Sequence, residues 1–162
     1  MRRTAIAFLI ACLVICNARA TIAIVDQQNL NDEGLMANPS TRFSQSFTPT
    51  LSSLDAVDVV LFVPGTQSLS LQLSVFMSDG LGGPLKGSTN FMTIPSSSES
   101  IPVEFTFQTP IVLQPGMIYT FSIGGLSMSQ FSVRYGSDTY AGGQMFDATF
   151  VYPNQDLTSA KD

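Results

Sequence analysis

A regular alternation of apolar and polar residues over positions 68–78, SLSLQLSVFMS, constrains the fold more than any other part of the sequence. The odd positions carry leucine, valine or methionine, and the even positions carry serine or glutamine, with Phe76 as the single exception. Only a β-strand places alternate side chains on opposite faces. A strand with one apolar and one hydroxyl-rich face is typical of an antiparallel sheet that covers a core on one side and meets water on the other.

The same period of two recurs along the chain, and turns rich in glycine, proline and serine separate its occurrences. The predicted strands are 21–25, 43–47, 54–63, 68–78, 89–94, 101–109, 117–123, 131–135 and 146–152. Eight or nine strands at such even spacing predict an all-β fold, namely an antiparallel two-sheet β-sandwich of jelly-roll type. Segment 26–41 is expected to be a loop, and residues 153–162 a polar C-terminal tail.

The first twenty residues, MRRTAIAFLIACLVICNARA, have the features of a secretory signal peptide. Arg2 and Arg3 precede an apolar run that is too short to span a bilayer, and a small-x-small cleavage site ends at Ala20. We therefore expect a secreted protein with no membrane insertion after cleavage and one β-sandwich domain at 21–152. The alternative is a bacterial lipoprotein, because the sequence around Cys12 resembles a lipidation motif.

Removal of residues 1–20 would take away both cysteines of the chain, so no disulfide or thiolate site is expected in the domain. Residues 21–162 keep four basic and all twelve acidic residues, and so carry a net charge of −8. This acidic balance argues against a nucleic-acid partner and against binding to anionic membranes.

The sequence contains no histidine, which excludes the usual serine-protease-like triad and histidine-ligated zinc. No glycine-rich nucleotide-binding motif occurs either. Paired carboxylates, as in glycoside hydrolases, are the remaining catalytic chemistry, with Glu99 and Glu104 as candidates. Asp55 and Asp58 are three residues apart on a predicted strand and are expected to face opposite sides. We expect a protein without enzymatic activity, with a carboxylate-dependent hydrolase as a remote alternative.

Calcium is the one cofactor for which the sequence offers ligands, since oxygen atoms are the only donors available. Asp79 precedes the turn GLGG, and Asp138 precedes TYAGG, so that each could bind calcium together with backbone carbonyls. Capping of the turns by the aspartate side chains is the alternative use of both residues.

Aromatic residues near two loops suggest a surface for ligands. Phe76 interrupts the polar face of its strand, while Tyr135 and Tyr140 flank the loop that contains Asp138. Rings presented at the rim of a sandwich can stack on the apolar faces of sugars. We therefore predict ligand binding by Tyr135, Asp138, Tyr140 and Phe76, with ordinary packing of the tyrosines as the alternative.

Four segments carry a resemblance to a family of bacterial secreted β-sandwich domains of the PEP-CTERM or choice-of-anchor type. The segments are QSFTPTLSSLDAVDVVLF, LSVFMSDGLGGPLKGS, VEFTFQTPIVLQPGMIYTFSI and YGSDTYAGGQMF, within residues 43–152. The resemblance implies a noncatalytic exported module whose partner is an extracellular polysaccharide or a cell-surface polymer. A structural or adhesive surface protein that binds other proteins is the alternative. Residues 153–162 lack the Pro-Glu-Pro motif, apolar helix and arginine cluster of the sorting anchor, so we expect a member without it.

Overall fold

The computed structural model describes residues 24–29, 35–36, 39–126, 130–137, 143–152, 155–157 and 159–161, and every regular element among them is a β-strand. The strands are β1 Gln27–Asn29, β2 Leu35–Met36, β3 Arg42–Phe47, β4 Ser53–Phe62, β5 Leu69–Phe76, β6 Leu85–Ser88, β7 Met92–Ile94, β8 Ile101–Val112, β9 Tyr119–Gly125, β10 Ser132–Ser137, β11 Met145–Asp147, β12 Val151–Tyr152, β13 Gln155–Leu157 and β14 Ser159–Lys161. Within these ranges no helix is long and apolar enough to cross a membrane.

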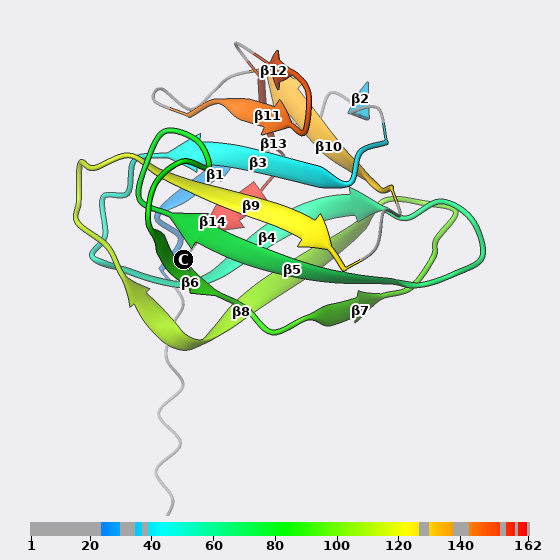
Figure 1. Ribbon diagram of the computed structural model, residues 1–162, viewed down its shortest axis with the longest axis horizontal. Helices are drawn as coiled ribbons and strands as arrows, with labels where there is room; N and C mark the ends of the chain where they lie inside the picture. Colours follow the sequence, from blue (N-terminus) through cyan, green and yellow to red (C-terminus); the bar gives the residue numbers. More distant parts are fainter. Residues whose placement is uncertain are drawn as a thin grey trace, which may run out of the picture.

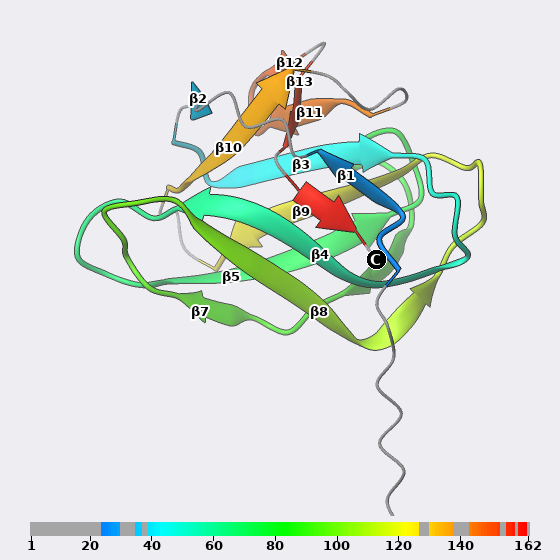
Figure 2. The same ribbon diagram turned by 180° about the vertical axis from the view of Figure 1, so that it is seen from behind.

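The strands form two antiparallel sheets that face each other (Figure 1). The front sheet, nearest the viewer in Figure 1, has the order β12-β11-β3-β9-β5-β6, with β7 also paired to β5. The back sheet, nearest the viewer in Figure 2, has the order β1-β14-β4-β10-β13, with β8 paired to β4 and β2 paired to β10. The predicted two-sheet β-sandwich is confirmed.

The strand pairs are nested along the chain in the manner of a jelly roll. β5 pairs with β6, β4 with β8, β3 with β9 and β2 with β10, so that each pair encloses the previous one in sequence. Successive pairs alternate between the front and back sheets. This winding of a long folded hairpin into two sheets is the jelly-roll topology. The described strands outnumber the eight or nine predicted because short strands extend both sheets.

The core lies between the sheets and follows the predicted alternation. On β5, Leu71, Leu73 and Val75 have no exposed surface. Other strands of both sheets supply alternate apolar residues in the same way, namely Val57, Val59 and Leu61 of β4, Val103, Phe105 and Phe107 of β8, and Tyr119, Phe121 and Ile123 of β9. The described part of the domain has no cysteine, so burial of apolar surface is its main source of stability. Each Å² of apolar surface that is buried contributes about 25 cal/mol to the free energy of folding.

The pairing of β4 with β8 is irregular at one point. Between the pairs Leu54–Ile111 and Ala56–Thr106, one residue of β4 lies opposite residues 107–110 of β8, and the consecutive residues Ala56 and Val57 of β4 are both buried. Asp55 before Val57 and Asp58 after it are therefore both exposed, although their spacing predicted opposite faces. The alternation of buried and exposed residues along β4 therefore changes phase at Ala56 and Val57, close to the irregular pairing, and the local sequence pattern does not reveal this.

Residues 155–157 and 159–161 are part of the sandwich, which corrects the predicted polar tail. β13 pairs with β10, and β14 pairs with both β4 and β1 (Figure 2). Asp156 and Leu157 are almost fully buried. β1 and β2 lie in the segment 26–41 that was expected to be a loop, and residues 24–25 of the predicted first strand are outside any strand.

One glutamine of the front sheet connects the two sheets through hydrogen bonds. Gln45, on the inward face of β3, is 1% exposed. Its amide nitrogen donates to the Asp156 carboxylate, and its Oε1 accepts a hydrogen bond of 3.1 Å from the backbone N–H of Leu157. Asn29 of β1 donates to the backbone carbonyl of Asp156 at 3.3 Å. These bonds satisfy polar groups that would otherwise be costly to bury, and they fix the C-terminal strands against the front sheet.

Candidate functional site

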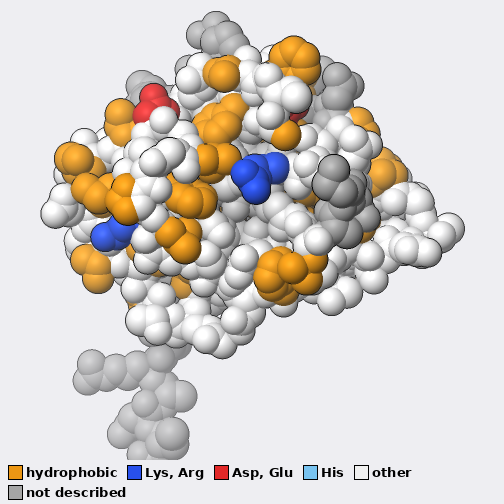
Figure 3. Space-filling model, in the orientation of Figure 1, with side chains coloured by type: hydrophobic (Ala, Val, Ile, Leu, Met, Phe, Trp, Pro, Cys, Tyr) orange, Lys and Arg blue, Asp and Glu red, His pale blue; other side chains and the backbone are white. Residues whose placement is uncertain are grey.

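The outward face of the front sheet carries a row of serines that crosses four strands. Ser44 of β3, Ser122 of β9, Ser74 of β5 and Ser88 of β6 are direct neighbours in the pairing. The Ser44 hydroxyl donates to Ser122 Oγ at 2.9 Å, and the hydroxyls of Ser74 and Ser88 are 2.8 Å apart. In Figure 3 backbone and uncharged polar side chains, both white, cover much of this face, and hydrophobic side chains gather in separate groups.

The row beside these serines contains the cation of the site. Arg42 of β3, Gly124 of β9 and Gln72 of β5 are neighbours in the pairing. The Nε atom of Arg42 lies 3.8 Å from the position that a Cβ on Gly124 would take. The Arg42 side chain therefore extends across β9, over a position without a side chain. Gln72 is held in place because its amide donates to the Thr89 carbonyl at 2.7 Å.

A turn held by several hydrogen bonds follows β5, the strand that carries Phe76. In the segment 78–84, the Ser78 hydroxyl donates to the Gly80 carbonyl and accepts from the Gly83 N–H. Thr120 of β9 accepts from the Gly80 N–H at 2.8 Å and donates to the Ser78 carbonyl at 2.9 Å. A Cβ on Gly83 would lie 2.4 Å from the Met77 carbonyl oxygen, so only glycine fits there. The turn anchors the end of β5, where Phe76 is located.

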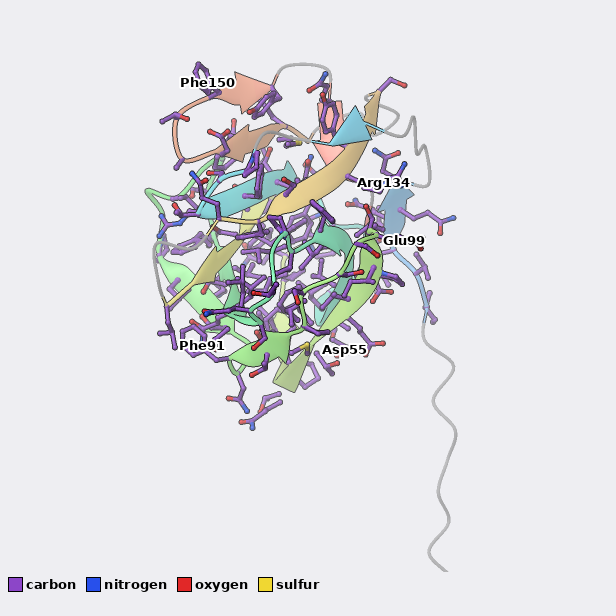
Figure 4. The ribbon with its side chains drawn as sticks, turned by 90° about the vertical axis from the view of Figure 1, so that its right-hand side faces the viewer. Asp55, Phe91, Glu99, Arg134 and Phe150 are labelled. Carbon is purple, nitrogen blue, oxygen red and sulfur yellow. The ribbon has the colours of Figure 1, made fainter. Side chains whose placement is uncertain are left out.

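These rows surround a hollow of about 170 Å³, which we call the front hollow. Its lining residues are Arg42, Gln72, Ser74, Phe76, Phe91, Ser122, Gly124 and Gly125. Phe76 is half-buried, whereas Phe91 is 45% exposed. Figure 4 shows Phe91 on one side of the sandwich, and Arg134 and Glu99 on the other. The front hollow thus combines two aromatic rings, hydroxyl and amide groups and one guanidinium.

Two larger hollows offer less varied chemistry. One of about 490 Å³ lies between β6 and β8 and is lined by residues 86–88 and 107–112. The other, of about 690 Å³, is lined by residues 64–70 with Leu126 and Gln130. The first combines an aromatic ring with Lys86, and the second contains neither an aromatic ring nor a charge. We therefore take the front hollow as the candidate site, since convergent polar groups beside apolar surface are typical of ligand sites.

Of the two predicted ligand-binding residues that the structure describes, Phe76 lines the front hollow and Tyr135 does not. Tyr135 belongs to β10 of the back sheet, is half-buried against the core, and packs on Tyr152 with ring centroids 6.5 Å apart. For Tyr135 the packing alternative therefore describes the observed contacts. Asp138 and Tyr140 lie outside the described residues.

The partner of Tyr135 belongs to a hairpin that was not expected. Segment 146–152 was predicted to be one strand, but Asp147 Oδ1 accepts the backbone N–H groups of Thr149 and Phe150 at 2.7 and 2.8 Å. This turn divides the segment into β11 and β12, with Met145 fully buried and Phe150 66% exposed. The prediction of a single strand over 146–152 was therefore wrong, because an aspartate-capped turn reverses the chain.

The same aspartate forms a titratable pair with Tyr152, whose hydroxyl donates to Asp147 Oδ2 at 2.7 Å. Partial burial alone would raise the pKa of Asp147, but the hydrogen bonds from Thr149, Phe150 and Tyr152 outweigh it and hold the pKa below 3.8. Partial burial, the hydrogen bond to Asp147 and the negative charge of Asp147 raise the pKa of Tyr152 to about 12. Both shifts favour the pair of carboxylate and neutral phenol.

Tyr152→Phe should lower the free energy of unfolding near neutral pH by at most about 1 kcal/mol, because the hydrogen bond is partly exposed. The contribution of Tyr152 is fully present below pH 10, the pKa of a free tyrosine, and is lost as the pH rises towards 12. The contribution of Asp147 is lost as the pH falls below 3.8. Urea unfolding of both proteins across pH should therefore give a stability difference that shrinks at both extremes; a difference independent of pH would contradict the pairing.

The loop of Asp79 does not provide a calcium site by itself. Asp79 is exposed, and the hydroxyl and carbonyl of the adjacent Ser78 are already used in hydrogen bonds within the turn. Among the described residues no three acidic, histidine or cysteine side chains gather at one point. Calcium requires six to eight oxygen ligands, so Asp79 would need ligands from elsewhere, and the other candidate, Asp138, lies in an undescribed segment.

Two carboxylates meet on the outer face of the back sheet, a contact that the sequence did not predict. Asp58 of β4 and Glu104 of β8 are direct cross-strand neighbours. Both are exposed, and Glu104 accepts a hydrogen bond of 2.8 Å from the Thr106 hydroxyl. Neither residue lines any of the three hollows described above. A flat exposed position lacks the enclosure that carboxylate catalysis of glycoside hydrolysis uses.

Sequence reasoning missed Arg42 and Phe91 as site residues. Phe91 lies inside the predicted strand 89–94 and Arg42 opens β3, and the neighbours of these residues in the sheet cannot be read from the local pattern. The one local signal was the polar face of residues 68–78, which contributes Gln72, Ser74 and Phe76 to the front hollow. The sequence matches no known protein-family model, and no curated protein is significantly similar to it.

Proposed function

We propose that the protein is a noncatalytic module that binds an extracellular polysaccharide in the front hollow. The observation that carries the proposal is the meeting of two aromatic rings, Phe76 and Phe91, with the polar side chains of Gln72, Ser74 and Ser122. A sugar has apolar C–H faces and hydroxyl edges. The rings can cover the former, and the amide and hydroxyl groups can exchange hydrogen bonds with the latter.

The size of the front hollow favours a polymer over a small molecule. Its volume of about 170 Å³ is below the roughly 300–1,000 Å³ that enclose a complete drug-sized ligand. A single sugar unit can occupy it while the rest of the polymer continues along the polar face of the front sheet. Ser74 and Ser88, the accessible end of the serine row, offer hydroxyl groups on that path, whereas Ser44 and Ser122 are buried.

The proposal includes export of the protein, and export favours an extracellular polysaccharide as the ligand. Residues 1–20 resemble a secretory signal, and residues 43–152 resemble PEP-CTERM or choice-of-anchor domains. A protein outside the cell meets cell-surface and matrix polysaccharides at high local concentration.

Phe76→Ala and Phe91→Ala should each weaken retention of the purified protein on a panel of soluble and insoluble polysaccharides. We expect the dissociation constant to rise about 5-fold to 30-fold, because an aromatic anchor in a binding site contributes roughly 1–2 kcal/mol. Phe150→Ala is the matched control, since this phenylalanine is 66% exposed and does not line the front hollow. Affinity electrophoresis provides the measurement.

The outcomes separate the proposal from its alternatives. No retention of the unaltered protein on any polysaccharide would sink the proposal and favour an adhesive protein that binds other proteins. Retention that survives both Phe76→Ala and Phe91→Ala would move the site elsewhere on the molecule. Turnover of aryl glycosides that Glu104→Gln abolishes would revive the hydrolase.

A further inference from the structure

The front hollow is lined by a positive charge, whereas the chain as a whole has a negative net charge. Among the described residues that line it, Arg42 is the one charged residue and there is no carboxylate. The chain as a whole has twelve acidic and seven basic residues. The described residues include no ion pair in which Arg42 takes part. A cation without a carboxylate partner, placed in a ligand site on an acidic protein, favours an anionic group on the ligand.

The position of the guanidinium is fixed by the sheet. Arg42 lies on β3, and its Nε passes over β9 at Gly124, where the absence of a side chain leaves space for it. The guanidinium is exposed and borders the same hollow as Phe76 and Phe91. An arginine fork matches a carboxylate with two parallel hydrogen bonds, which a lysine cannot reproduce.

The described carboxylates nearest the site, Asp79 in the turn 78–84 and Asp147 of β11, do not line the front hollow. The exposed carboxylates of β4 and β8, Asp55, Asp58 and Glu104, lie on the outer face of the back sheet. The two sheets of a sandwich pack about 10 Å apart. Screening at physiological salt reduces charge interactions over about 8 Å, so these carboxylates repel an anion in the front hollow only weakly.

We infer that the polysaccharide carries free carboxylates, as in a uronic-acid polymer, and that Arg42 binds one of them while Phe76 and Phe91 cover the sugar rings. This inference rests on the proposed function, since it assigns the chemical class of the ligand to the same hollow. Arg42 is then the residue that discriminates between acidic and neutral polymers.

The test compares polymers that differ only in charge. The probes are polygalacturonate, alginate and hyaluronan, each offered with free carboxylates and in esterified form, and affinity electrophoresis gives the dissociation constants. We expect the protein to bind at least one free acid about 10-fold or more tightly than its ester. Arg42→Gln should remove most of this preference, and Arg42→Lys should restore only part of it.

Lys86→Gln is the matched control, because Lys86 is an exposed cation of the same sheet that does not line the front hollow. This variant should keep the preference, and thermal unfolding should show that all variants remain folded. Equal affinity for acid and ester, binding of neutral polymers only, or a preference that survives Arg42→Gln would overturn the inference while leaving the proposed function intact. Tighter Arg42-dependent binding to dextran sulfate than to every uronate would replace carboxylate by sulfate. Binding to no polysaccharide at all would overturn the proposed function itself.

Discussion

Phe121→Ala should lower the free energy of unfolding by about 3–5 kcal/mol, the range for removal of a fully buried phenylalanine from a core. Phe121 has no exposed surface and lies on β9, which pairs with β3 on one side and β5 on the other. Its ring is 6.1 Å from that of Phe47, measured between centroids. Truncation leaves a cavity between the sheets, and urea unfolding measures the loss.

Two further variants keep this prediction testable. Phe121→Leu retains most of the side-chain volume and should lower the free energy of unfolding less than Phe121→Ala does. This variant is needed because a loss of several kcal/mol can leave Phe121→Ala unfolded. Phe150→Ala removes an equally large side chain that is 66% exposed, and should change stability by less than about 0.5 kcal/mol. Similar losses for Phe121→Ala and Phe150→Ala would contradict the observed core.

The fold could be predicted from the sequence because burial in a regular strand follows a period of two. On β5 the serine-leucine alternation identifies Leu71, Leu73 and Val75 as core residues without knowledge of any neighbour, and all three are fully buried. The prediction failed where the chain departs from that regularity. The register shift between β4 and β8 at Leu54 and Ala56 and the turn at Asp147 both interrupt the alternation of buried and exposed residues. Both depend on hydrogen bonds that a local sequence pattern does not contain.

The candidate site could be predicted only in part, because it is assembled from strands that are distant in sequence. Phe76 was identifiable since it breaks a polar face. Arg42 and Gly124 become meaningful only when β3, β9 and β5 are placed side by side. The same limit applies to residues 155–157, whose polar composition predicted a tail. Their burial follows from partners such as Gln45, far away in the chain.

Gln45→Leu should lower the free energy of unfolding by about 3 kcal/mol and make β13 open more often, although glutamine and leucine have similar side-chain volumes. The Asp156 carboxylate and the Leu157 N–H would each lose the hydrogen bond that Gln45 provides, and such a loss costs roughly 1–3 kcal/mol for each buried group. Hydrogen exchange at residues 155–157 should accelerate more than exchange at the centre of β9, because the lost bonds belong to the C-terminal strands.

The comparison with two other variants decides whether these hydrogen bonds or simple packing hold β13 in place. Gln108→Leu, at an exposed position of β8, should leave stability nearly unchanged. The double variant Gln45→Leu with Asp156→Leu should regain part of the loss, since it no longer buries a carboxylate that has lost its Gln45 partner. If the double variant were as unstable as the sum of its single changes, packing alone would account for the position of β13. A partial recovery would mean that the hydrogen bond between Gln45 and Asp156 holds the C-terminal strands in place, because burying either side chain without the other is costly.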